Sequence, residues 1–293
     1  MSKMTFEEKN NILTQNLREF SKKQDIASQQ KELTALDLAL LYCEAYKKAD
    51  DILFHFNALS ADFSSTDKII FLSEICRSEH SEKIKKMLFI GSPEPTTAGA
   101  HSKISYLKNK YNDIAFECFS RSVVNAKPDY AASFAECCEN VFEGRCEFCI
   151  LPIMNSSDGR LMSFYALIDR YDLKICDVIS IDGEDSTSTF CYALIGRACK
   201  EQQRTRLQKN QRYIFEFSIV DDCADFLTPL LMAANKIGAK LTCVDSLPME
   251  YSADMQKFFF SFSIPAQSTL AFRLFVALKH QTYTPIGIYK EIN

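Results

Sequence analysis

The amino-acid sequence predicts a fold of mixed class, α/β plus α+β, preceded by a helical region. Residues 1–90 contain no glycine and place apolar side chains at helical spacing, as a helical subdomain does. From residue 101 onward, short apolar strands alternate with helices, which is typical of a parallel sheet covered by helices. Residues 212–293 then follow the order βαββαβ. We therefore divide the chain into a helical segment 1–92, an α/β lobe 101–199 and an α+β domain 212–293.

The composition excludes several classes of protein. A chain of 293 residues is expected to form two or three domains, at roughly 100 to 200 residues each. The net charge of −4 argues against a nucleic-acid partner, because phosphate neutralisation requires a concentrated basic face. The sequence has no apolar N-terminal segment and no apolar run long enough to span a bilayer. We therefore expect no membrane partner and a cytoplasmic location.

The twelve cysteines are scattered through periodic apolar segments. Outside a small, loop-rich framework such cysteines usually stay reduced and pack as small hydrophobes. Cys137, Cys138, Cys146 and Cys149 come closest to a metal-ligand set, but only the last two have CxxC spacing, and structural zinc requires a second pair. We therefore expect no metal and no cofactor.

Four helical stretches are expected in segment 1–92. The first begins at Thr5 with an acidic first turn, the second covers about 34–56, the third starts at Thr66, and the fourth covers 82–89. The run 91–99 is rich in glycine, proline, serine and threonine and indicates a linker. The charged run 200–212 indicates a solvated linker or a short helix.

The α/β lobe is predicted to begin with the order βαβαβ. Strands are expected at 104–107, 121–124 and 147–151, with helices at 114–120 and 130–142 and a parallel sheet as the result. Pro152 is expected to end the third strand, because proline cannot donate to a sheet ladder. A helix at 161–170, capped by Ser157 or Asp158, and a strand at 173–181 should follow.

A polar cluster, residues 155–159, directly follows the third strand of this lobe. Open α/β sheets bind ligands just beyond the carboxyl ends of their strands, so this cluster is a candidate site. The alternative is that Asn-Ser-Ser-Asp-Gly is simply a solvated turn.

This order, with Leu151-Pro152-Ile153-x-Asn155-Ser156-x-x-Gly159 between strand and helix, resembles the prephenate dehydratase family. The resemblance implies one lobe of the periplasmic-binding-like dehydratase fold, with Asn155 and Ser156 lining a cleft between two lobes. Met154 stands where the family has glutamate, and the turn at 108–113 lacks the family's glycines. The family's Thr-Arg-Phe motif reads Ser188, Thr189 and Phe190 here. The second lobe, which the family places before this motif, is missing from the sequence.

The C-terminal βαββαβ pattern resembles an ACT domain, the ferredoxin-like regulatory module that follows many dehydratase lobes. Strands are expected at 213–220, 239–245, 258–264 and 282–289, with helices at 225–237 and 270–278. Phenylalanine-binding members carry Gly-Ala-Leu and Glu-Ser-Arg-Pro signatures. The corresponding residues here, and thus the candidate ligand-binding residues, are Asp225, Phe226, Leu227, Asp245, Ser246, Leu247 and Pro248. The alternative is an ACT domain retained for dimerisation.

Some dehydratases of the P-protein type carry a chorismate mutase domain in the position of segment 1–92. A mutase must hold a dianionic substrate with several converging cations. Arg18, Lys22 and Lys23 are the basic residues at about the expected place, and Lys47, Lys48 and Arg77 do not complete a recognisable motif. A helical dimerisation or packing element is therefore the preferred interpretation of this segment.

The function predicted from the sequence is that of a non-catalytic protein of aromatic amino acid (phenylalanine) metabolism. It would be a ligand-binding or regulatory oligomer, a dimer through the ACT domain, that binds an aromatic amino acid or a prephenate-like molecule. Threonine cannot replace the bidentate charge of arginine on a dicarboxylate, which is why activity is not expected. The alternative is a carbon–oxygen lyase that converts prephenate to phenylpyruvate, water and CO₂, or a chorismate mutase, with a cleft completed by another subunit.

Overall fold

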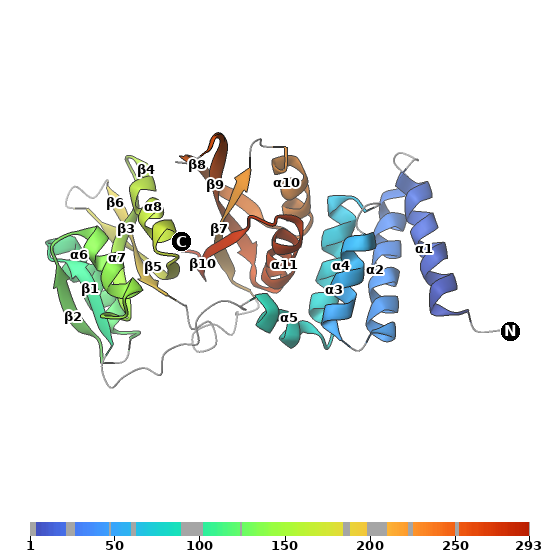
Figure 1. Cartoon of the computed structure of the whole chain (residues 1–293), viewed down its shortest axis with the longest axis horizontal. Coiled ribbons are helices and arrows are strands. Elements are labelled where there is room, and N and C mark those ends of the chain that lie inside the picture. The colour runs from blue at the N-terminus through green and yellow to red at the C-terminus, as the bar shows by residue number, and fades with distance from the viewer. Residues whose placement is uncertain are drawn as a thin grey trace. The chain divides into compact units, whose positions relative to one another are not determined.

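The computed structural model describes residues 4–21, 27–46, 48–59, 63–88, 102–123, 125–183, 188–197, 210–221, 225–249 and 252–292 (Figure 1). The chain forms two compact units. The first comprises Met1–Ile90, Asp222–Leu241 and Gln267–Tyr283, and the second comprises Gly91–Asp221, Thr242–Ala266 and Thr284–Asn293. The predicted domains 1–92, 101–199 and 212–293 remain a prediction. The predicted linker 91–99 and most of the charged run 200–212 lie outside the described residues.

The first unit is built from helices. They are α1 (Phe6–Ser21), α2 (Ala27–Ala45), α3 (Ala49–Leu59), α4 (Ser65–Arg77), α5 (Ser81–Leu88), α10 (Leu227–Lys236) and α11 (Thr269–Lys279). Helix α4 packs against α2, α10 and α11, and α1 packs against α2. Helix α4 starts with a capping box, in which Asp67 N donates to Ser64 Oγ at 3.1 Å and Ser64 N donates to Asp67 Oδ2 at 3.2 Å. The expected single stretch 34–56 is divided between α2 and α3.

The second unit contains one mixed sheet with the strand order β2-β1-β3-β6-β5-β10-β7-β9-β8, with β4 paired to β3. Strand β1 is parallel to both β2 and β3, as the predicted βαβαβ order requires. The helices of this unit are α6 (Lys110–Ser120), α7 (Phe134–Phe142) and α8 (Met162–Arg170). The strands are β1 (Lys103–Leu107), β2 (Lys127–Ala131), β3 (Phe148–Asn155), β4 (Gly159–Arg160), β5 (Lys174–Asp182), β6 (Thr189–Gly196), β7 (Arg212–Asp221), β8 (Lys240–Met249), β9 (Ser252–Pro265) and β10 (Thr284–Lys290).

Helices cover both faces of this sheet at β3. Successive strand residues point to opposite faces, and Ile150 accordingly packs with Ala115 and Phe119 of α6. Its neighbours Cys149 and Leu151 pack in a second cluster, with α7 and α8. A strand buried on both faces explains the continuous apolar run that identified it in the sequence.

The C-terminal strands follow the predicted order βαββαβ along the chain, and in the sheet they lie in the order β10-β7-β9-β8. Strand β7 is antiparallel to both β9 and β10. Strand β10 also pairs with β5 in parallel, at Gly287 and Ile175, which makes the sheet continuous. A Cβ atom on Gly287 would lie 2.6 Å from the carbonyl oxygen of Ile175. The junction therefore requires glycine at this position.

The strand predicted at 121–124 is wrong over residues 121–123, the part of it that the structure describes. Ser122 N and Val123 N donate to the carbonyl of Phe119 at 3.0 and 3.1 Å, so this segment is the turn that ends α6. Val123 is 6% exposed and packs in the same core cluster as Phe119. The Val123 side chain packs into the core beneath the turn, and the second strand of the lobe is β2, which begins a few residues later at Lys127.

Two expectations around the motif are also wrong. Pro152 does not end β3, because the strand continues to Asn155 with a register shift against β6 between Pro152 and Met154. Proline is tolerated at such an irregularity, where the ladder is already interrupted. Neither Ser157 nor Asp158 caps α8, whose N-cap is Leu161 without a side-chain hydrogen bond.

Candidate functional site

The motif cluster forms the tight turn between β3 and β4. The Asn155 side chain holds this turn together, because Asn155 Oδ1 accepts from Ser157 N at 2.9 Å and from Asp158 N at 2.5 Å. Asn155 Nδ2 donates to Asp158 Oδ2 at 2.7 Å. Gly159 closes the turn with φ +71°, a conformation that favours glycine. Both ends of the Asn155 amide are thus engaged within the turn itself.

The structure brings the five predicted residues of this lobe together at one end of β3 and β6. Thr189 N donates to Ser156 Oγ at 3.0 Å, and Ser156 N donates to the Thr189 carbonyl at 2.9 Å. Gly183 N donates to the carbonyl of Ser188 at 2.6 Å. Phe190 is partly buried, and its ring centroid lies 5.2 Å from that of Tyr111.

Strands β5 and β6 form an antiparallel hairpin, and Thr189 and Phe190 are the first residues of β6. Asp182 pairs with Thr189, so only residues 183–188 connect the two strands. The neighbouring Met154 is 44% exposed.

Sequence reasoning missed Arg160, which directly follows the motif glycine. Its side chain is 4% exposed. Nη1 donates to Asp245 Oδ2 at 3.0 Å and to the carbonyl of Phe259 at 3.2 Å. Nη2 donates to Ser261 Oγ and to Glu216 Oε1, the latter at 3.4 Å. Burial disfavours the charged guanidinium, but the carboxylates of Glu216 and Asp245 outweigh it and raise the pKa of Arg160.

Glu216 is the second buried member of this network and is 2% exposed. The Tyr165 hydroxyl donates to both of its carboxylate oxygens, at 3.0 and 2.9 Å, and Ser261 Oγ donates at 2.5 Å. Burial and the charge of Glu216 raise the pKa of Tyr165, which keeps the phenol protonated as a donor. Arg160 also lies 4.8 Å from the centroid of the Tyr165 ring. A signal was present in the sequence, since a glutamate inside an apolar strand requires a buried partner.

The second predicted set of residues divides between the two units. In the second unit, Asp245 accepts from Arg160 and from Cys243 Sγ, the latter at 3.1 Å. Leu247 packs against the core, whereas Ser246 and Pro248 are exposed along β8. In the first unit, Asp225 precedes Phe226, the N-cap of α10, and Leu227 begins that helix. Phe226 is 8% exposed, and its ring lies edge-on to His280 at 5.4 Å.

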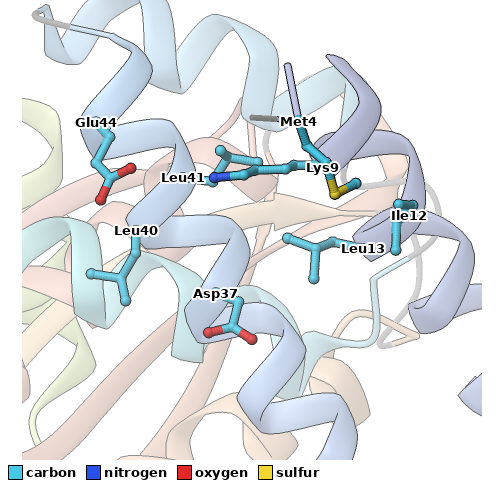
Figure 2. Close-up of a pocket in the computed structure, with 8 residues that line it drawn as sticks. All are labelled: Met4, Lys9, Ile12, Leu13, Asp37, Leu40, Leu41 and Glu44. Carbon is cyan, nitrogen blue, oxygen red and sulfur yellow. The ribbon is translucent and has the colours of Figure 1, made fainter. Parts of the chain in front are cut away.

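A shallow groove of about 390 Å³ lies in the first unit, between α1 and α2 (Figure 2). Its walls combine apolar side chains with one lysine and two carboxylates. One cation beside two carboxylates does not suit a dianionic ligand such as chorismate. The lining residues are Met4, Lys9, Ile12, Leu13, Asp37, Leu40, Leu41 and Glu44.

The described residues hold no cluster of histidine, cysteine or carboxylate side chains that could bind a metal. Cys176 is disulfide-bonded, so the expectation that the cysteines stay reduced is wrong at this position. Nine cysteines of the described part carry free thiols, including all four of the group around Cys146. None of the helices in the described ranges has the length and apolar character of a membrane span. Lys22, Lys23 and Lys47, weighed above as mutase cations, lie outside the described residues.

Solved prephenate dehydratases have a similar fold over 64% of this chain. The prephenate dehydratase of Streptococcus mutans matches with a TM-score of 0.50 and 18% identity, over 64% of this chain and 98% of that chain. The prephenate dehydratase of Arthrobacter aurescens, solved in complex with L-Phe, matches with a TM-score of 0.50 and 11% identity, over 64% and 90%. GqqA, described as a novel type of quorum quenching acylases, matches with a TM-score of 0.51 and 18% identity, over 67% and 97%.

These identities are low, so the likeness establishes the fold alone. No protein-family model and no curated protein matches the sequence.

Proposed function

We propose that this chain is a non-catalytic relative of the prephenate dehydratases that acts as a ligand-binding or regulatory oligomer in aromatic amino acid metabolism. One observation carries the proposal. The guanidinium of Arg160, which follows the motif, is buried against Glu216 and Asp245 and has both terminal nitrogens engaged. A substrate carboxylate would have to displace a protein carboxylate to reach it.

The chemistry of dehydration supports the same conclusion. The enzyme must bind two substrate carboxylates and stabilise a departing hydroxyl in a cleft that excludes water. Thr189 stands where the family's arginine is expected, and a hydroxyl does not supply a bidentate positive charge. Arg160 is a poor substitute, since withdrawing it would leave Glu216 buried and unpaired.

The geometry around the motif supports the proposal independently of charge. The β5–β6 hairpin joins its strands through residues 183–188, at the point where the family inserts its second lobe. Asn155, a cleft residue in the family motif, uses both ends of its side-chain amide for hydrogen bonds within its own turn. The absence of a facing wall, which the sequence predicts, and the engaged amide would each remove contacts that a transition state needs, at about tenfold in rate per 1.4 kcal/mol.

We propose further that the C-terminal βαββαβ segment is an ACT domain that binds an aromatic amino acid and dimerises. The A. aurescens protein in complex with L-Phe makes phenylalanine the first ligand to test. Ser246 and Pro248 keep the residue types of the binding signature and are exposed on β8. A cytoplasmic location remains our prediction for such a metabolic protein.

Two assays on the purified full chain test the proposal. Phenylpyruvate formation from prephenate is measured beside the S. mutans enzyme, and we expect no turnover above background. A thermal-shift screen with phenylalanine, tyrosine, tryptophan, prephenate and chorismate should identify a ligand, because binding to the folded state alone adds about 2.7 kcal/mol at a hundred times the Kd. Turnover at an ordinary enzymatic rate would refute the non-catalytic function. A flat screen would refute ligand binding.

A further inference from the structure

The outer face of helices α1 and α2 is apolar and lies open in the described part of the first unit. Met4, Ile12 and Leu40 line the groove between these helices, and each is between 46 and 50% exposed. Leu41 forms its buried floor at 8% exposure. In Figure 2 Met4, Lys9 and Ile12 lie on the side of α1 and Leu40 and Leu41 lie on α2, with Lys9 extending from α1 toward α2. A groove lined by several exposed apolar side chains marks an interaction surface.

Helix α2 carries apolar residues on two faces. Its inner face is buried within the unit through Ala35, Leu38 and Tyr42. Its outer face exposes Leu33 and Leu40, seven residues apart and hence on the same side of the helix, at 60 and 50%. Surface helices normally present polar residues opposite their buried face, and exposed leucines that gather on that outer face are typical of a contact surface. The second face of α2 therefore calls for a partner.

The charges at the rim identify the kind of partner. Lys9 stands on α1, and Asp37 and Glu44 stand on α2, all three exposed. No ion pair joins any of them to another described residue. The two carboxylates lie two helical turns, about 11 Å, apart on either side of Leu40. The surface thus carries an apolar centre with one positive and one negative side.

We propose that this surface binds a second copy of the same chain across a two-fold axis. A two-fold axis places a patch against itself, so Lys9 of each copy faces Asp37 and Glu44 of the other. The apolar residues Met4, Ile12 and Leu40 of both copies then fill the two grooves. The interface uses only the first unit and does not depend on the proposed C-terminal dimer or on any ligand.

The test is the mass of the full chain by sedimentation over a concentration series. Leu40→Asp should weaken association at least about tenfold, because it places a charge in the centre of the interface. Phe54→Asp is the matched control, since Phe54 is 78% exposed on α3 and does not line the groove. Circular dichroism melts confirm that both variants remain folded.

Charge reversal gives a sharper criterion. Lys9→Glu alone, and Asp37→Lys with Glu44→Lys, each create repulsion at both halves of a two-fold interface and should weaken association. An equimolar mixture of the two variants should associate again, because each introduced charge then meets an introduced opposite charge. A monomeric wild type, an unchanged mass for Leu40→Asp, or a mixture that fails to associate would overturn the proposal. If Leu40→Asp leaves the mass unchanged, or if the mixture fails to associate, the association that is observed must use another surface.

Discussion

Replacing Arg160 by methionine should lower the free energy of unfolding by about 3 to 5 kcal/mol, the cost of breaking a buried ion pair by removing one partner. Methionine keeps most of the length of the stem and removes the guanidinium. Glu216, at 2% exposure, would be left as a buried carboxylate with hydroxyl donors alone, those of Tyr165, Ser261 and Tyr289, and no positive charge beside it. The loss should therefore come almost entirely from the stranded glutamate.

Asp245 should contribute little to this loss. Its side chain is 32% exposed, so water can solvate the carboxylate once Arg160 is gone. Ion pairs at such exposure are worth about 0 to 1 kcal/mol. Asp245→Asn alone should therefore lower the stability by less than about 1 kcal/mol, well below the effect of Arg160→Met.

The sign of a second substitution tests this reasoning. Glu216→Gln should destabilise the wild type, because it removes the buried partner of Arg160. In the Arg160→Met background the same change should stabilise, since the amide oxygen still accepts from Tyr165 and the buried charge is gone. The chain has no tryptophan, so urea unfolding is followed by circular dichroism. Lys103→Met, which breaks an exposed pair with Asp129 at 3.8 Å, is the control. A loss below about 1 kcal/mol for Arg160→Met, equal to the control, would refute a buried charge network.

Three further predictions, made with four substitutions, test other parts of the second unit. Gly287→Val should cost about 3 kcal/mol or more by urea unfolding, because its side chain would clash with Ile175, whereas Gly159→Asn, in open space, should cost less than about 1 kcal/mol. Burial raises the pKa of the Cys137 thiol from 9.0 to about 12. The stabilisation that this protonated thiol provides is complete below pH 9.0 and is lost toward pH 12, at about 1.4 kcal/mol per pH unit. The unfolding free energy of Cys137→Ala should therefore fall less steeply with pH than that of the wild type. Asn155→Ala should lower the unfolding free energy by about 1 to 2 kcal/mol and leave the thermal shift caused by ligands unchanged. A variant of unchanged stability that no longer responds to the ligand would show instead that Asn155 binds it.

Local patterns in the sequence were sufficient for most of the elements. The apolar run at 148–151 identified β3, and the helical spacing around Ile69 identified α4. Local patterns failed where tertiary context decided the outcome. Val123 fills the core beneath a turn, although a valine pair favours a strand. Strand β3 continues through Pro152, because its pairing with β6 shifts register between Pro152 and Met154.

The network around Arg160 could not be predicted because its members lie far apart in the sequence. Arg160 meets Asp245 across 85 positions and Glu216 across 56. No local period relates these residues, and the pairing follows from the addition of β10 beside β5, which places the C-terminal strands in the same sheet. Glu216 and Arg160 were each visible as an anomaly, a charge next to apolar segments, but only the sheet order made them partners.

The same network also explains why the two family motifs should be considered together. Arg160 follows the dehydratase-like motif, and Asp245 begins the segment that the sequence predicts to be the counterpart of the ACT ligand signature. Arg160 Nη1 lies 3.0 Å from Asp245 Oδ2. Asp245 thus occupies the position of a small anion beside the guanidinium, and Arg160 that of an amino group beside the carboxylate. A ligand that engages Asp245 must compete with Arg160, and the freed guanidinium would still be held by Glu216. The proposed ligand at β8 would therefore act through Arg160 on the β3–β4 turn that carries Asn155.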